Sequence, residues 1–106
     1  MVQDFSAALG DLFVTEGVSG YVLRRVEKDR VLLENVAVDP AHKGEGIGRR
    51  LIGFLENEAR LLGLPVELYT NEAMVENLAL YPRFGYREIA RRTENGLRRV
   101  YFRKDL

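Results

Sequence analysis

The chain has 106 residues, of which 46% are hydrophobic and 30% are charged, values that are ordinary for one globular domain with a single core. Its formal net charge is zero, so bulk charge gives no reason to expect a nucleic-acid partner. Cysteine is absent, which excludes disulfides, a cysteine nucleophile and thiolate metal sites. We find no signal peptide and no apolar run of membrane-spanning length, and therefore expect a cytoplasmic protein with no membrane partner.

The N-terminal part of the chain predicts a short helical turn followed by strands. Residues 4–9 favour one helical turn that ends at Gly10. Strands are predicted over Leu12–Glu16, Tyr21–Lys28 and Val31–Val38. The last of these is almost continuously apolar, which is typical of a strand buried on both faces. Asp39-Pro40 ends it, because proline cannot donate a hydrogen bond to a neighbouring strand.

A long helix and a further strand follow. A helix is predicted over Ile47–Leu62, because its apolar residues recur at helical spacing. Gly63 suits a left-handed cap, and Pro65 prevents the helix from continuing. The strand Val66–Thr70 would then lie parallel to Val31–Val38, joined to it by a right-handed crossover through the helix.

The C-terminal part predicts a second helix and a hairpin. Asn71 is a suitable cap for a helix over Glu72–Leu80, which Pro82 and Gly85 are expected to end. The hairpin is predicted from the strands Tyr86–Arg92 and Leu97–Arg103, joined by the turn Glu94-Asn95-Gly96. This order of elements implies one α/β (α+β) domain over residues 1–106, with helices packed on a mixed, mostly antiparallel sheet.

The most informative feature is the turn Lys43-Gly44-Glu45-Gly46-Ile47-Gly48-Arg49-Arg50, which joins an apolar strand to the long helix. Glycines allow positive φ and let a ligand approach with no Cβ in the way. The first N–H groups of a helix have no internal partner and lie at the positive end of its dipole. The turn therefore predicts a phosphate site, although glycines alone fit a tight turn that binds nothing about equally well.

Other phosphate-binding motifs fit this turn less well. A phosphate-loop NTPase needs Gly-Lys followed by Ser or Thr, and Gly48-Arg49-Arg50 stands here instead. A dinucleotide fingerprint counted from Gly44 needs a glycine where Arg49 stands. Glu67 lies roughly where a ribose-binding acid would follow, which is weak support by itself.

Two segments together resemble the motifs of the GNAT N-acetyltransferase superfamily. Val36-Ala37-Val38-Asp39-Pro40, followed by Lys43-Gly44-Glu45-Gly46-Ile47-Gly48 and Leu51-Ile52, resembles its acetyl-CoA signature, Gln/Arg-x-x-Gly-x-Gly/Ala. Asn77-Leu78-Ala79-Leu80-Tyr81-Pro82-Arg83-Phe84-Gly85-Tyr86 is similar to the second GNAT motif, in which an Asn, a small residue and a Tyr share one helix. The resemblance covers residues 12–106, and it implies a GNAT-like fold in which the two central parallel strands splay apart.

The resemblance also implies which residues bind acetyl-CoA. The glycine turn would hold the pyrophosphate through its N–H groups, and the end of the preceding strand would pair its backbone with the pantetheine arm. The residues assigned in this way are Val36, Ala37, Val38, Lys43, Gly44, Glu45, Gly46, Ile47, Gly48, Arg49, Asn77 and Tyr81. The lysine at the first place of the signature keeps the positive charge but lacks the bidentate fork of arginine.

The activity implied by the resemblance is direct transfer of an acetyl group from acetyl-CoA to a primary amine. Tyr81 matches the family's usual proton donor to the departing CoA thiolate, and Asn77 lies four residues earlier on the same helix face. Glu34 is the candidate general base, because strand alternation places it on the face of Val36 and Val38. An ion pair between this carboxylate and an arginine is the competing interpretation.

The chain departs from the family before Leu12, where members usually carry an extra strand and two helices that form one wall of the acceptor site. A minimal member, a truncated member and a chain completed by a partner all fit this departure. A non-catalytic CoA-binding module and a nucleotide-binding domain of another class are the alternative functions. We expect a homodimer, because a short N-terminus should leave a sheet edge exposed. The single histidine, His42, has no carboxylate cluster beside it, so no metal site is expected.

Overall fold

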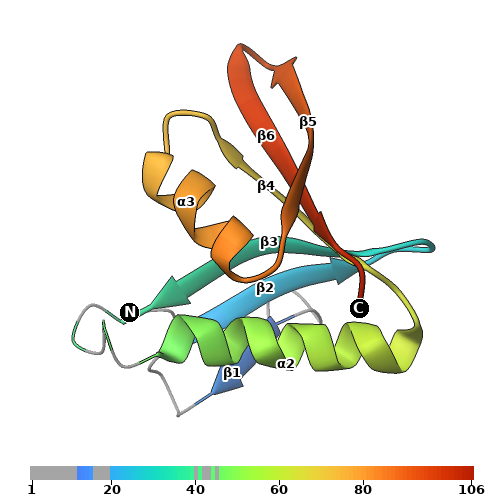
Figure 1. Ribbon diagram of the computed structural model, residues 1–106. Coiled ribbons are helices and arrows are strands. Elements are labelled where there is room, and N and C mark those ends of the chain that lie inside the picture. The colour runs from blue at the N-terminus through green and yellow to red at the C-terminus, as the bar shows by residue number, and fades with distance from the viewer. Residues whose placement is uncertain (1–11, 16–19, 40, 42–43, 45) are drawn as a thin grey trace.

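The computed structural model describes residues 12–15, 20–39, 41, 44 and 46–106. Within them the chain forms six strands and two helices (Figure 1). The strands are β1 (Leu12–Thr15), β2 (Gly20–Val26), β3 (Val31–Val38), β4 (Val66–Asn71), β5 (Arg87–Glu94) and β6 (Leu97–Lys104), and the helices are α2 (Ile47–Leu62) and α3 (Val75–Arg83). The helical turn predicted for residues 4–9 and the strand residue Glu16 lie outside the described residues.

The strands form one mixed sheet in the order β1-β2-β3-β4-β6-β5. β3 and β4 are parallel, and every other neighbouring pair is antiparallel. This arrangement confirms the predicted mixed, mostly antiparallel sheet with a central parallel pair joined through a helix. In Figure 1, α2 runs along β1, β2 and β3, α3 lies beside β4, and the β5–β6 hairpin rises at the other end of the sheet.

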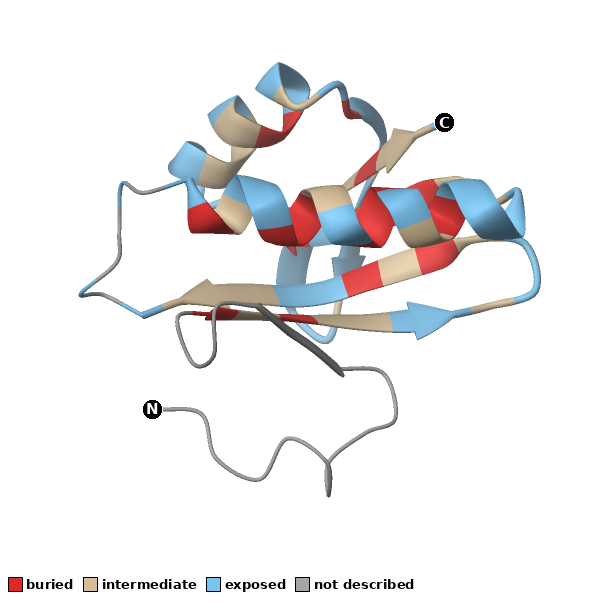
Figure 2. Ribbon diagram, turned by 90° about the horizontal axis from the view of Figure 1, so that it is seen from below, coloured by how far each residue is buried: buried red, intermediate tan, exposed pale blue. Residues whose placement is uncertain are grey.

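The apolar stripe of α2 faces the sheet and forms the centre of the core. Leu51, Leu55 and Ala59 are fully buried, whereas the opposite side of the helix is exposed (Figure 2). The strand residues packed in the same core are Val22, Val31, Leu33, Val66, Leu68, Val100 and Phe102. Gly63 ends α2 with a φ of 71°, as predicted. Each fully buried leucine contributes about 1.5–3 kcal/mol of burial free energy, so this stripe fixes the helix on the sheet.

A close approach at Gly20 sets where α2 begins. A Cβ on this residue would lie 2.6 Å from the backbone oxygen of Ala37 and within 3.2–3.3 Å of Leu51 and Ile47. A contact below 3.0 Å with backbone cannot be relieved by a side-chain rotation, so only glycine fits. The start of β2 therefore lets the N-terminal end of α2 pack directly over the end of β3.

The second helix begins later than the sequence predicted. The predicted helix is Glu72–Leu80 with Asn71 as its cap, whereas α3 begins at Val75. Asn71 is the last residue of β4 and pairs with Arg99 of β6. Its side-chain oxygen accepts a hydrogen bond from the N–H of Ala73 at 2.8 Å. Asn71 therefore closes a turn that precedes the helix, since an Asn side chain can bond the backbone two residues on.

The C-terminal elements follow the prediction with small shifts. Pro82 lies inside the last turn of α3, which ends at Arg83, because a proline so near the end interrupts little of the helix. Asn95 and Gly96 have φ values of 52° and 77°. Positive φ at both central residues is what a two-residue hairpin turn requires, and it confirms the predicted hairpin. Both strands of the hairpin run slightly beyond their predicted C-terminal ends.

Candidate active site

A cleft opens in the middle of the sheet, where the parallel strands separate. β3 and β4 pair only from Val31 opposite Val66 to Leu33 opposite Leu68, although β3 continues to Val38. Beyond the paired segment, the side of β3 that faces β4 has no strand partner among the described residues. A cavity of about 460 Å³, lined by residues of β3, β4, α3 and β6, lies here. The cleft confirms the splay that the resemblance implied.

A β-bulge in β3 changes which face its later residues occupy. Leu33 and Asn35 pair with consecutive residues of β2, so Glu34 is an extra residue in this ladder. The extra residue reverses the alternation, and Val36 therefore shares the face of Leu33. The prediction that Glu34 lies on the face of Val36 and Val38 is wrong for this reason.

Glu34 lies at the cavity wall, and its side chain is 28% exposed. Its carboxylate forms an ion pair with the guanidinium of Arg25, at 3.3 Å between nitrogen and oxygen. The prediction that this strand is buried on both faces is also wrong here, because Glu34 and Asn35 are both exposed. An exposed ion pair of this kind is worth only about 0–1 kcal/mol, so the carboxylate can exchange partners at little cost.

The glycine turn has the backbone conformation that its sequence predicts. Gly44 and Gly46 have φ values of 86° and 78°, which a residue with a Cβ adopts only at a cost of about 1–2 kcal/mol. Gly46 occupies the N-cap position of α2, no side chain caps the helix there, and its first turn carries no acidic residue. The backbone N–H of Arg50 makes the first helical bond, to Gly46 at 3.1 Å. Lys43 and Glu45 lie outside the described residues.

The start of α2 touches both of the segments that carry the sequence motifs. Ile47 is buried in the core, and a Cβ on Gly48 would lie 3.6 Å from a side-chain carbon of Val38. Arg49 places its guanidinium carbon 5.5 Å from the ring centre of Phe84, at the end of α3. The end of β3, the glycine turn and the end of α3 therefore meet in space, although they are far apart in sequence.

The residues predicted on the second helix both reach the cavity. Asn77 and Tyr81 line it from α3. The ring of Tyr81 lies 5.9 Å from the rings of both Tyr86 and Phe102, measured between centres. Burial raises the pKa of the Tyr81 hydroxyl above its ordinary value, so this group is protonated at neutral pH. Of the described residues, none is hydrogen-bonded to that hydroxyl, which leaves it available to a ligand in the cavity.

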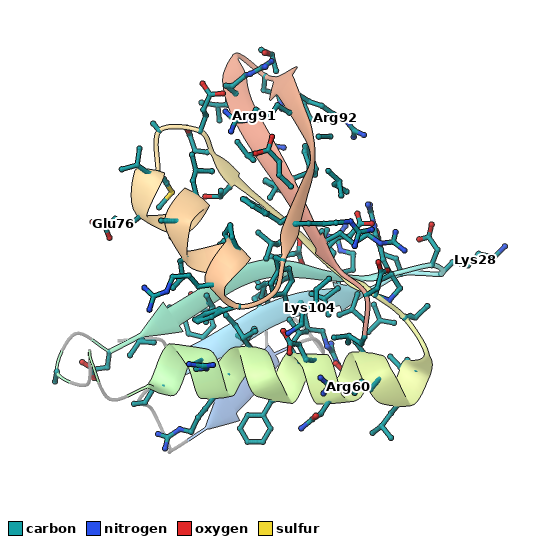
Figure 3. All side chains as sticks on the ribbon, in the orientation of Figure 1. Lys28, Arg60, Glu76, Arg91, Arg92 and Lys104 are labelled. Carbon is teal, nitrogen blue, oxygen red and sulfur yellow. The ribbon has the colours of Figure 1, made fainter. Side chains whose placement is uncertain are left out.

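A polar network lies on the side of Tyr81 where its ring packs against Tyr86. The hydroxyl of Tyr86 donates a hydrogen bond to Glu56 of α2 at 2.8 Å. The ammonium of Lys104 lies 3.1 Å from the same carboxylate and donates to the backbone oxygen of Phe84 at 2.8 Å. Burial, and then the charge of Glu56, raise the pKa of the Tyr86 hydroxyl. Lys104 is the last residue of β6 and lies next to α2 (Figure 3), so the network ties both helices to β6.

Comparison with known proteins agrees with this geometry. Residues 8–88 match the family model described as an acetyltransferase (GNAT) domain. The chain belongs to the GNAT acetyltransferase family. This GNAT chain is 38% identical over 71 residues to N-alpha-acetyltransferase RimI of Mycobacterium tuberculosis. The aligned region spans 67% of this chain and 40% of the relative.

Solved structures of other acetyltransferases share the fold of this GNAT chain. The ribosomal-protein-S18-alanine N-acetyltransferase of Escherichia coli superposes with a TM-score of 0.76 at 22% identity, over 93% of this chain and 72% of the other. A GNAT family acetyltransferase of Elizabethkingia anophelis with acetyl-CoA bound gives a TM-score of 0.76 at 18% identity, over 90% and 75% of the two chains. At these identities the similarity establishes the fold.

We searched the part of the GNAT chain that the structure describes for membrane-spanning helices and for metal-binding groups. No helix in that part is long and apolar enough to cross a membrane. No group of three or more His, Cys, Asp or Glu side chains gathers there in a way that could hold a metal ion. His42 lies outside the described residues.

Several residues of the GNAT cleft were missed from the sequence. Thr70 and Met74 line the cavity beside Asn77, and Arg99 enters it from β6. The guanidinium of Arg99 lies 4.5 Å from the ring centre of Tyr69, on the neighbouring strand. The alternation of β4 could have indicated Thr70, which follows the buried Leu68 on the same face. Nothing in the sequence pattern indicated Arg99, since its position depends on the pairing of β4 with β6.

Proposed function

We propose that this chain is an acetyl-CoA-dependent N-acetyltransferase that moves an acetyl group to a primary amine by direct transfer. The observation that carries the proposal is the cleft between β3 and β4, with the Tyr81 hydroxyl and Asn77 on one wall and the glycine turn at the adjoining helix end. The family match and the acetyl-CoA-bound structure of a relative support acetyl-CoA as the acyl donor.

The residues fit the requirements of such a substrate. Phosphates are accommodated by the uncapped N-terminal turn of α2, where positive φ at Gly44 and Gly46 keeps side chains away from the backbone N–H groups. The unpaired side of β3 after Leu33 offers backbone groups to an extended arm, and Val36 and Ala37 lie in this segment. Apolar side chains suffice at those positions, because only their backbone takes part.

Acetyl-CoA supplies a thioester. The amine nitrogen forms a C–N bond to the carbonyl carbon of this thioester, and the C–S bond breaks. In the proposed step Tyr81 donates its hydroxyl proton to the departing sulfur, and its oxygen recovers, directly or through water, the second proton that the nitrogen releases as the amide forms. The amine must lose a proton to attack, and Glu34 is our proposed acceptor of that proton, directly or through water. Its exchangeable ion pair with Arg25 fits this role, since an incoming ammonium can replace the guanidinium.

The amine acceptor that the comparisons favour is the α-amino group at the N-terminus of a polypeptide. RimI of Mycobacterium tuberculosis is an N-alpha-acetyltransferase, and the Escherichia coli structure is an enzyme for an alanine of ribosomal protein S18. The cleft is lined by one acidic and one basic side chain, Glu34 and Arg99. These groups are suited to the ammonium and the backbone carbonyl groups of a peptide end.

Ligand-induced stabilisation tests the proposed acyl donor. Acetyl-CoA at about 100 times its dissociation constant should raise the free energy of unfolding by about 2.7 kcal/mol. For a chain of this size, the melting temperature should then rise by roughly 10–20 °C. NAD and ATP serve as controls, because a nucleotide-binding domain of another class would respond to them. A rise with NAD or ATP, and none with acetyl-CoA, would overturn the proposal.

The alternative is a non-catalytic CoA-binding module, or a subunit that a partner or a second copy completes. It predicts the same thermal shift with acetyl-CoA but no acetylated product. The distinction between the two therefore depends on transfer and not on binding.

A further inference from the structure

Three side chains at the junction of β4 and α3 form a connected polar network at the cavity wall. The side-chain nitrogen of Asn77 donates a hydrogen bond to the hydroxyl oxygen of Thr70 at 3.1 Å. The same nitrogen donates to the sulfur of Met74 at 3.7 Å. The Thr70 hydroxyl in turn donates its proton to that sulfur at 3.7 Å. All three residues line the cavity, and Thr70 is only 7% exposed.

The network uses every side-chain donor that these residues possess. An Asn amide has two N–H donors, and both are directed to Thr70 and Met74. The hydroxyl of Thr70 has one donor, and it is directed to the sulfur. The atom left open is the oxygen Oδ1 of Asn77, to which none of the described residues donates. With the nitrogen held by Thr70 and Met74, this oxygen is the open polar atom of a side chain that lines the cavity.

The backbone around the network is fixed as well. The N–H of Met74 donates to the backbone oxygen of Asn71 at 2.9 Å, and the N–H of Ala73 donates to the side chain of Asn71 at 2.8 Å. This turn connects the end of β4 to the first turn of α3 and so places Met74 between Thr70 and Asn77. The orientation of the amide is therefore set before a ligand arrives.

We propose that Thr70 is a positioning residue that holds the amide of Asn77 with its oxygen in the cleft, where it accepts a hydrogen bond from an N–H of the pantetheine arm. The proposal rests on acetyl-CoA as the acyl donor. The secondary amides of that arm carry both N–H donors and carbonyl acceptors, and the open oxygen of Asn77 can pair only with the donors. Thr70 acts through Asn77 and needs no contact with the substrate.

A double-mutant cycle on binding tests this role. Thr70→Val keeps the shape and strand propensity of the residue but removes the hydrogen-bond acceptor, while Thr70→Ser keeps the hydroxyl as a matched control. By calorimetry, Thr70→Val should weaken acetyl-CoA binding about 3- to 10-fold, the effect of one hydrogen bond. Thr70→Ser should bind close to the wild-type affinity. In the Asn77→Ala background, Thr70→Val should have no further effect, because the residue it positions is gone.

A second readout needs no substrate. In NMR spectra of the ligand-free protein, the side-chain N–H₂ resonances of Asn77 should shift and exchange faster with water in Thr70→Val than in Thr70→Ser. Wild-type affinity in Thr70→Val, or independent effects of Thr70→Val and Asn77→Ala that multiply in the double variant, would overturn the positioning role alone. A wild-type protein that does not bind acetyl-CoA would overturn the proposed function together with this inference.

Discussion

Replacement of Tyr81 by phenylalanine is expected to lower kcat on the order of 100-fold without changing the dissociation constant for acetyl-CoA. The reason is that the hydroxyl supplies a proton only as the thiolate departs, and a general acid in such a step contributes at least about that factor. The folded state should be little affected, because among the described residues the hydroxyl has no hydrogen-bond partner to lose. Steady-state kinetics and calorimetry on the same preparation measure both quantities.

Tyr86→Phe is the matched control for this experiment. Its ring lies beside that of Tyr81, but its hydroxyl is bonded to Glu56 and not directed to the cavity. Loss of that buried hydrogen bond should cost about 1–3 kcal/mol of stability, with kcat near that of the wild type. Tyr81→Phe should show the reverse pattern. An unchanged kcat in Tyr81→Phe would remove this hydroxyl from the mechanism.

Replacement of Gly46 by alanine is expected to raise the KM for acetyl-CoA roughly 10- to 100-fold with little change in kcat. A Cβ at this position would project into open space beside the turn. There we expect it to obstruct a phosphate that binds the backbone N–H groups, and loss of one charge-assisted hydrogen bond costs about 1.5–3 kcal/mol. The contact is the same in the ground state and the transition state, so the loss should appear in KM. Gly46 has a positive φ of 78°, so a stability loss of about 1–2 kcal/mol should accompany the substitution.

Gly63→Ala separates the loss of stability from the loss of binding. Gly63 caps the other end of α2 with a φ of 71°, and a Cβ at Gly63 or at Gly46 would meet no described atom within 4 Å. The two substitutions should therefore destabilise the fold to a similar extent. Only Gly46→Ala should weaken acetyl-CoA binding, and equal KM values in the two variants would show that the turn does not bind the phosphates.

Much of the fold could be predicted from the sequence, because its signals are local. The apolar spacing of Ile47–Leu62 and the left-handed cap at Gly63 both depend on residues close in sequence. The Asn95-Gly96 turn is equally local, since positive φ at two consecutive residues selects this pair. The parallel pairing of β3 and β4 followed from the helix between them. The spacing of Asn77 and Tyr81 on one helix is a local signal as well, and both residues line the cavity together with Val36.

The errors arose where tertiary contacts override a local pattern. The bulge at Glu34 depends on the register between β2 and β3, and no composition rule indicates an extra residue in that ladder. The sequence favours Asn71 as a helix cap, but its pairing with Arg99 keeps it in the sheet. The role of Thr70 likewise depends on a tertiary contact, the hydrogen bond from Asn77 of α3.

The most direct test of the central claim is a transfer assay read by mass spectrometry. The protein is incubated with acetyl-CoA and a panel of amines that contains peptides with free N-termini, free amino acids and polyamines, with the same peptides blocked at the N-terminus as controls. The proposed function predicts one acetyl group on the free α-amine of a peptide, with an equal amount of free CoA, and none on its blocked form. Binding of acetyl-CoA with no acetylated product anywhere in the panel would contradict it and favour the non-catalytic module.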